Sequence, residues 1–163
     1  FCLAGLLVSL SKVAFMGFGI GSARFNFTGF SGHSAMSATL WPVMFWLVSG
    51  RLPAIARVAA MAVGYLIPLL VGFSRLALDV HSTSEVVSGL LLGYTLSSAF
   101  LISQRSSQLK GFSVVQLCVA LLVPVLLFSQ GRLATTQGFL MNLSTQITGL
   151  KKPFTRSELL KQH

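Results

Sequence analysis

The most informative stretch of the sequence is residues 74–85, which read SRLALDVHSTSE. The runs on either side of it, 58–74 and 86–104, contain no charged residue. Each run approaches the roughly 20 apolar residues that a helix needs to cross the apolar core of a bilayer. The pattern therefore predicts two membrane-spanning helices, joined by a polar connection at the membrane surface.

Three further apolar runs extend this pattern along the chain. Residues 34–50 and 112–130 are also uncharged and complete a set of four predicted spans. Residues 1–11 are uncharged but too short, and we interpret them as the end of a truncated helix. The expected fold is all-α, a polytopic bundle of transmembrane helices. We expect a membrane-embedded core over 1–130, truncated at its N-terminus, and a basic C-terminal tail over 131–163.

The composition agrees with a membrane environment. Only 9% of the residues are charged and 53% are hydrophobic, whereas soluble domains carry about 25% charged residues. The net charge is +9, but the basic residues stand singly between apolar runs instead of clustering on one polar face. This pattern argues against nucleic-acid binding and favours contact with membrane lipids. The oligomeric state stays open.

Two short basic connections predict the orientation in the membrane. Residues 50–57 and 104–111 each carry two basic residues. Short basic loops stay in the cytoplasm, so we expect 12–33 and 74–85 on the opposite face, in the periplasm of a bacterial inner membrane. This orientation also places the basic tail on the outer face, although a count of its basic residues alone would place it in the cytoplasm. Long segments cross a membrane with little regard to charge, so the short loops decide the orientation.

The connection 74–85 has the residue types of a nucleophilic site. If the helix begins before His81, then Glu85 lies one turn further along the same face. Its carboxylate can accept the Nδ1–H of the imidazole and leave Nε2 free to attack a phosphorus atom. Arg75 precedes both residues, and its planar guanidinium matches the oxygens of a phosphate group.

A second polar stretch, GFSGHS over residues 29–34, supplies complementary groups. Ser31 and Gly32 precede a predicted helix, whose free backbone N–H groups can bind an anion. His33 follows them and can protonate a leaving alkoxide. The second stretch therefore predicts the other half of a phosphate-handling site.

Each of these residues also has a purely structural explanation. A histidine at a membrane surface can be an interfacial polar residue, Arg75 can anchor a helix end, and Glu85 can simply pair with Arg75. However, two of the three histidines and two of the three acidic residues fall in 29–34 and 74–85, on one predicted face. This concentration favours a functional site, because ionisable groups near membrane cores are costly.

The two stretches resemble the type 2 phosphatidic acid phosphatases, which share a core fold with the vanadium haloperoxidases. Residues 30–33 read FSGH where the family has PSGH, and 74–85 keep the family spacing SR, five residues, H, three residues, D, with Glu85 replacing the aspartate. The family's first motif, K, six residues, RP, is poorly met. Eleven residues separate Lys12 from Arg24, and Phe25 follows instead of proline.

The resemblance implies a metal-free phosphatase that forms a covalent intermediate and needs no cofactor. His81 would attack phosphorus and form a phosphohistidine, His33 would protonate the leaving oxygen, and Glu85 would orient His81. The residues implied to hold the phosphate oxygens are Lys12, Arg24, Ser31, Gly32 and Arg75. The implied substrates are lipid phosphates, such as phosphatidic acid, or polyprenyl pyrophosphates.

Other functions stay open from the sequence. A lipid phosphotransferase would use the same residues and pass the phosphoryl group to another lipid. A membrane transporter would favour ionisable residues within the spans, and the four predicted spans contain none. A purely structural membrane subunit would leave the paired polar stretches unexplained.

Overall fold

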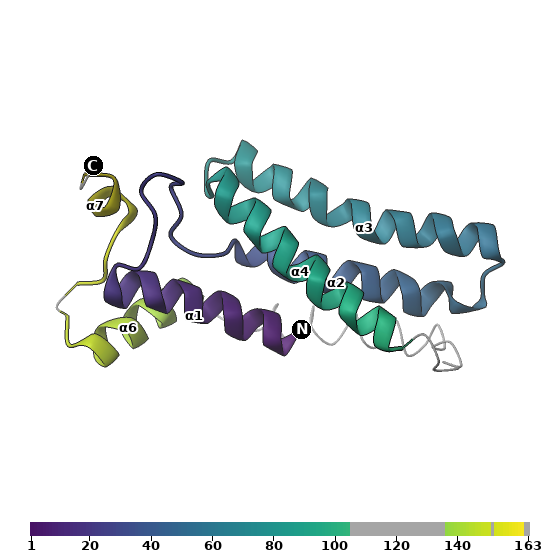
Figure 1. Cartoon of the computed structure of the whole chain (residues 1–163), viewed down its shortest axis with the longest axis horizontal. Helices are drawn as coiled ribbons and strands as arrows, with labels where there is room; N and C mark the ends of the chain where they lie inside the picture. The colour runs from purple at the N-terminus through teal and green to yellow at the C-terminus, as the bar shows by residue number, and fades with distance from the viewer. Residues whose placement is uncertain (105–135, 151, 162–163) are drawn as a thin grey trace, which may run out of the picture.

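Helices dominate the computed structural model, which describes residues 1–104, 136–150 and 152–161 (Figure 1). A single isolated antiparallel bridge, between Ser22 and Phe27, occurs in this part of the chain. The helices in order are α1 (Cys2–Phe18), α2 (Gly32–Val48), the short 3-10 helix η1 (Ser49–Arg51), α3 (Ala54–Ala77), α4 (Thr83–Ser103), α6 (Thr136–Thr148) and α7 (Arg156–Lys161). The prediction of an all-α fold is confirmed.

Helices α2, α3 and α4 form one packed group, and α1 lies beside it with α6 on its flank (Figure 1). Helix α2 contacts both α3 and α4, while α1 contacts α2, α4 and α6. The loop from α1 to α2 and the turn from α3 to α4 lie at the same end of the group (Figure 1). Both polar stretches of the sequence therefore meet at one end of the bundle, as predicted.

In the part of the chain that the structure describes, two helices are long and apolar enough to cross a membrane, judged by length and composition: α3 and α4. They cover the predicted spans 58–74 and 86–104 to within one residue. Helix α2 has 17 residues and is shorter than a usual span. The fourth predicted span, 112–130, lies outside the described residues.

Helix α1 is longer than the sequence suggested. The apolar run ends at residue 11, but the helix continues through Lys12 to Phe18. A single lysine is a good helix former, so it ends the uncharged run without ending the helix. The helix stops at Gly19, which adopts a left-handed φ of 67°, a conformation that glycine reaches at little cost.

Helix α3 presents most of its apolar side chains outward. Only 11% of its most apolar window is buried inside the protein. Leu66, Leu70 and Phe73 are among the exposed side chains. A long apolar face without protein cover is typical of a surface that contacts lipid or another protein.

Helices α2 and α4 approach each other through small residues. On α4, Gly89 and Gly93 are buried, and on α2 they face Ser31 and Ala35. A Cβ atom on Gly93 would lie 2.4 Å from the carbonyl oxygen of Ala35, and one on Gly89 would lie 2.8 Å from that of Ser31. Small residues at this spacing let two helix backbones come close. The close approach brings the beginnings of α2 and α4 together.

We expect Gly93→Ala to destabilise the protein by about 1–3 kcal/mol, because the added methyl group meets backbone that has to move. Thermal unfolding in detergent, followed by circular dichroism, measures this effect. The matched control is Gly5→Ala, whose new Cβ would lie 3.8 Å from the Met36 side chain and should leave the melting temperature unchanged or slightly higher. Equal melting temperatures for the two variants would contradict the close α2–α4 contact.

Candidate active site

Helix α4 begins with a capping box that fixes the Glu85 side chain. Ser82 is the N-cap, its Oγ accepts from the Glu85 N–H at 3.4 Å, and the Glu85 carboxylate accepts from the Ser82 N–H at 3.3 Å. The helix therefore starts after His81, and the assumption that it begins before His81 is wrong. The two side chains still meet, with His81 Nδ1 2.8 Å from Glu85 Oε2. The contact forms because a capping-box glutamate folds back over the N-cap.

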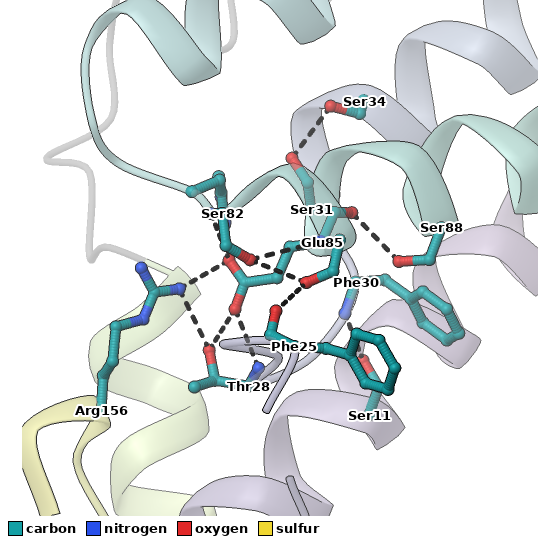
Figure 2. A network of polar contacts seen from close by, with 12 residues as sticks. Ser11, Phe25, Thr28, Phe30, Ser31, Ser34, Ser82, Glu85, Ser88 and Arg156 are labelled. Atoms are coloured by element: carbon teal, nitrogen blue, oxygen red, sulfur yellow. Dashed lines mark hydrogen bonds and ion pairs between the residues drawn. The ribbon is translucent and has the colours of Figure 1, made fainter. Parts of the chain in front are cut away.

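The Glu85 side chain is completely buried and fully bonded. Its Oε1 accepts from the backbone N–H of Thr28 at 2.9 Å and from the Thr28 hydroxyl. Its Oε2 accepts from Ser82 N–H and from Arg156 Nη2, the latter at 2.6 Å (Figure 2). The same oxygen accepts from His81. These donors offset the cost of burying a carboxylate. A carboxylate beside Nδ1 places the imidazole hydrogen there and leaves Nε2 of His81 with its lone pair.

A cavity of about 470 Å³ lies beside this carboxylate. Basic and imidazole side chains from several elements line it: Lys12 from α1, His33 from α2, Arg75 from α3, His81 from the following turn and Arg156 from α7. Apolar side chains, among them Phe15, Met16 and Met141, line other parts of the wall. A lining that contains both basic and apolar side chains suits a ligand with an anionic head and an apolar tail.

Ser31 and Gly32 are not among the residues that line the cavity. Ser31 is the N-cap of α2 and is buried. Its backbone N–H donates to the Glu85 carbonyl oxygen at 3.0 Å, and its Oγ lies 3.0 Å from Ser34 Oγ. In this arrangement Ser31 joins the starts of α2 and α4. The role of both residues in holding phosphate stays a prediction.

Arg24 also lies outside the cavity that holds Lys12 and Arg75. The bridge between Ser22 and Phe27 folds this loop into a tight turn. Arg24 lies over the Phe25 ring, 5.5 Å from its centroid, and lines a neighbouring cavity with His81 and Arg156. The structure therefore places Lys12 and Arg24 in two different cavities, both of which His81 lines, and the role of Arg24 in holding phosphate stays a prediction.

Two contributors were missed from the sequence, Thr28 and Arg156. Thr28 lies in the loop between α1 and α2, and Arg156 lies in the tail that the sequence analysis left without a role in the site. A local signal existed for the helix that carries Arg156: residues 155–158 read TRSE, a capping box. Its glutamate, Glu158, accepts from the Thr155 N–H at 2.8 Å. That signal predicts a helix start but says nothing about where the helix packs.

The surroundings of His33 disfavour its charged form. Burial lowers the pKa of His33 from its ordinary value, and the positive charges of Arg75 and Lys12 lower it further. His33 lies one residue before the predicted span 34–50, at the surface end of the bundle. In the free protein it is therefore neutral at neutral pH. A bound anion would reverse part of this effect, because negative charge favours the imidazolium.

Comparison with known proteins identifies the family. The PAP2 superfamily model matches residues 9–109, and the chain belongs to this superfamily. The chain is 42% identical to a Klebsiella pneumoniae protein named "Uncharacterized 22.5 kDa protein in cps region", over 99% of this chain and 79% of that protein. It is 33% identical to phosphatidylglycerophosphatase B of Bacillus subtilis (strain 168), over 50% of this chain and 40% of that protein. No solved structure matches the chain. Membership of this superfamily supports a phosphatase of the PAP2 kind.

We expect the His33 imidazole to titrate below pH 6.5, its unperturbed value, in the free protein. Added inorganic phosphate should move the midpoint upward, because the anion stabilises the imidazolium among the surrounding cations. NMR titration of ¹⁵N-histidine-labelled protein in detergent measures both effects, with His33→Gln identifying the signal by its loss. A midpoint at or above 6.5 that phosphate leaves unchanged would contradict this description of the cavity.

Proposed function

We propose that the protein is an integral-membrane phosphatase that hydrolyses a lipid phosphate or a polyprenyl pyrophosphate through a phosphohistidine. The observation that carries the proposal is the 2.8 Å contact between His81 Nδ1 and the buried Glu85 carboxylate, beside a cavity lined by Lys12, His33 and Arg75. One imidazole is oriented as a nucleophile, and the second lies among basic groups suited to an anion.

The reaction proceeds in two displacements at phosphorus. In the first, Nε2 of His81 forms a bond to phosphorus, the bond to the lipid oxygen breaks, and His33 gives its proton to that oxygen. In the second, water attacks the phosphohistidine, His33 takes a proton from the water, and inorganic phosphate leaves as His81 is regenerated. Glu85 keeps the imidazole in place and offsets the positive charge that develops on it.

Positive charge around the cavity stabilises the phosphoryl group as it transfers. Lys12 and Arg75 line the cavity with His33 and His81, and preorganised charge of this kind usually supplies the largest part of a rate enhancement. The phosphate dianion also favours the protonated form of His33, so substrate binding prepares the general acid. The family resemblance adds Ser31, Gly32 and Arg24 as further candidate ligands of the phosphate oxygens.

The proposed substrate is a lipid because apolar side chains line part of the cavity and the bundle has apolar outer surfaces. Phe15, Met16 and Met141 line the cavity together with the basic groups. The exposed apolar face of α3 and the length of α3 and α4 support insertion in a membrane. The name of the Bacillus subtilis relative, phosphatidylglycerophosphatase B, supports a glycerophospholipid phosphate as the first substrate to test.

The direct test is phosphate release in detergent from phosphatidylglycerol phosphate, phosphatidic acid and a polyprenyl pyrophosphate. We expect turnover of at least one lipid, and His81→Gln should reduce it at least about 10³-fold, as removal of a nucleophile does. The matched control is His163→Gln, which removes the third histidine and should retain activity. Turnover by a folded His81→Gln protein would exclude the nucleophile assignment, and no turnover of any lipid would exclude the proposed function.

The same assay tests for a metal requirement. Within residues 1–104, 136–150 and 152–161, no three His, Cys, Asp or Glu side chains gather in an arrangement that could hold a metal ion. We therefore expect the parent activity to survive EDTA. Loss of turnover in EDTA that Mg²⁺ restores would contradict a mechanism based on the histidines alone.

We also expect the site to face the periplasm in a bacterial inner membrane, opposite the short basic connections. In a variant with serine at Cys2 and Cys118, a cysteine at the exposed position Thr83 should react with an impermeant thiol reagent added to intact spheroplasts. A cysteine at Ala54, which is exposed at the other end of α3, should react only after the membrane is broken. The opposite labelling pattern would reverse the orientation.

A further inference from the structure

Arg156 lies far along the chain from the other groups at the Glu85 carboxylate, yet it makes a close contact with it. Its Nη2 is 2.6 Å from Glu85 Oε2, the same oxygen that faces His81 Nδ1 at 2.8 Å. The same Nη2 lies 3.4 Å from the Thr28 hydroxyl, which also bonds the carboxylate (Figure 2). Arg156 follows the 9–109 region that the family model matches, so it belongs to none of the motifs described above.

We propose that Arg156 is a positioning residue that holds the Glu85 carboxylate and shares its negative charge with His81. The catalytic role of Arg156 rests on the proposed function. The contact of its guanidinium with a buried carboxylate does not depend on that function. On this proposal, the segment that carries Arg156 contributes a residue to the site.

The structure holds Arg156 in place through several contacts with α1. The Phe154 N–H donates to the Met16 carbonyl oxygen at 2.9 Å, and the Phe154 ring covers Gly19. Ahead of it, Leu140 of α6 is buried in a cluster with Phe15 and Met16. These contacts tie the segment before Arg156 to the last turns of α1, beside the cavity.

A capping box then sets the direction of the chain at Arg156 itself. Glu158 Oε2 accepts from the Thr155 N–H at 2.8 Å and from the Thr155 hydroxyl at 2.9 Å. Arg156 is thus the first residue of α7. Its side chain is 33% exposed, whereas the Glu85 side chain is completely buried. The guanidinium therefore approaches the carboxylate from the solvent side and covers it.

The charge balance around Glu85 explains what the second cation does. A buried carboxylate favours the imidazolium of a histidine that contacts it. The charge of Lys12 also acts on Glu85, but Arg156 is the cation in direct contact with the oxygen that faces His81. An imidazolium has no lone pair and cannot attack phosphorus. With Arg156 on the same oxygen, part of the charge of the carboxylate is offset, and this weakens its attraction for a second proton on the imidazole.

Five other charged or titratable side chains lie around His81, and none of them takes the place of Arg156 at Glu85 Oε2. In residues 1–104, 136–150 and 152–161, no hydrogen bond or ion pair joins any of these five side chains to Glu85. They line the two cavities that meet at His81. They are Lys12 from α1, Arg24 from the loop that follows, His33 from α2, Arg75 from α3 and Asp79 from the turn before His81.

The experiment compares Arg156→Ala with Lys152→Ala in the complete chain. Lys152 is exposed, lies in the same segment, and its loss changes the net charge equally. For Arg156→Ala we expect the acid limb of the kcat/KM profile to move to higher pH by about one unit, because the imidazolium loses a neighbouring like charge. On the acid limb itself, below both midpoints, kcat/KM should fall about tenfold. Lys152→Ala should keep the parent profile, and Arg156→Lys, which retains the charge, should recover most of it.

A second measurement separates this inference from the proposed function. NMR titration of the His81 imidazole, identified with His81→Gln, reports its protonation whether or not any lipid is turned over. In Arg156→Ala the imidazolium should persist to higher pH than in the parent and in Lys152→Ala. If Arg156→Ala does not fold, Arg156→Gln, which keeps a donor without the charge, should show the same shift.

Three outcomes would overturn the assignment. An unchanged His81 titration in Arg156→Ala would show that Arg156 does not govern the imidazole. A raised KM with an unmoved acid limb would make Arg156 a phosphate contact, and an equal loss of kcat at every pH would make its role structural. Absence of lipid turnover by the parent protein would refute the proposed function, and the titration would still decide the role of Arg156.

Discussion

The buried carboxylate of Glu85 is the interaction on which the rest of the site depends. Removing an ionised carboxylate from water costs several kcal/mol unless donors replace the water. Here the donors come from the loop before α2, from the N-cap of α4, from His81 and from α7. The loop before α2, the 81–82 stretch at the start of α4, and α7 are distant from one another in the sequence, so satisfying one charge requires them to converge. The cavity lies where they converge.

The packing of α2 against α4 makes this convergence possible. Glu85 and the small residues Gly89, Gly93 and Ser97 are all buried on one face of α4, at intervals of four residues. The close backbone approach that the glycines permit brings the Ser31 N–H within hydrogen-bonding distance of the Glu85 carbonyl oxygen, 3.0 Å. His33 is two residues further along α2. A stripe of small residues in the apolar part of the bundle therefore determines how the two histidine-bearing segments meet at its end.

Much of this arrangement could be predicted from the sequence because it depends on local patterns. Uncharged runs indicated α3 and α4, and the spacing of His81 and Glu85 indicated their contact. The reason given for that contact was wrong, because a capping box and not a continuous helix turn brings the side chains together. A capping box, Ser82 to Glu85, was present in the sequence and gives the correct start of α4.

What the sequence could not supply is long-range placement. The motif spacing left Arg24 as a possible site residue, but the turn closed by Ser22 and Phe27 puts it in a neighbouring cavity. Arg156 was read as part of a basic tail, because charge alone does not distinguish a solvated arginine from one that covers a buried carboxylate. Such a distinction depends on how α6 and Phe154 pack on α1, and no local pattern encodes that packing.

The different surroundings of the two histidines support a division of roles between them. His81 faces a carboxylate that fixes its Nδ1 hydrogen, whereas His33 faces the charges of Arg75 and Lys12 and has its pKa lowered by burial and by those charges. Two groups of one chemical type can act as nucleophile and as acid when their environments differ in this way. The negative charge that His33 needs to hold a proton is absent from its own surroundings and arrives with the phosphate. The proposed acid is thus prepared by the substrate, while the proposed nucleophile is prepared by the protein, through a carboxylate whose charge the chain itself partly offsets.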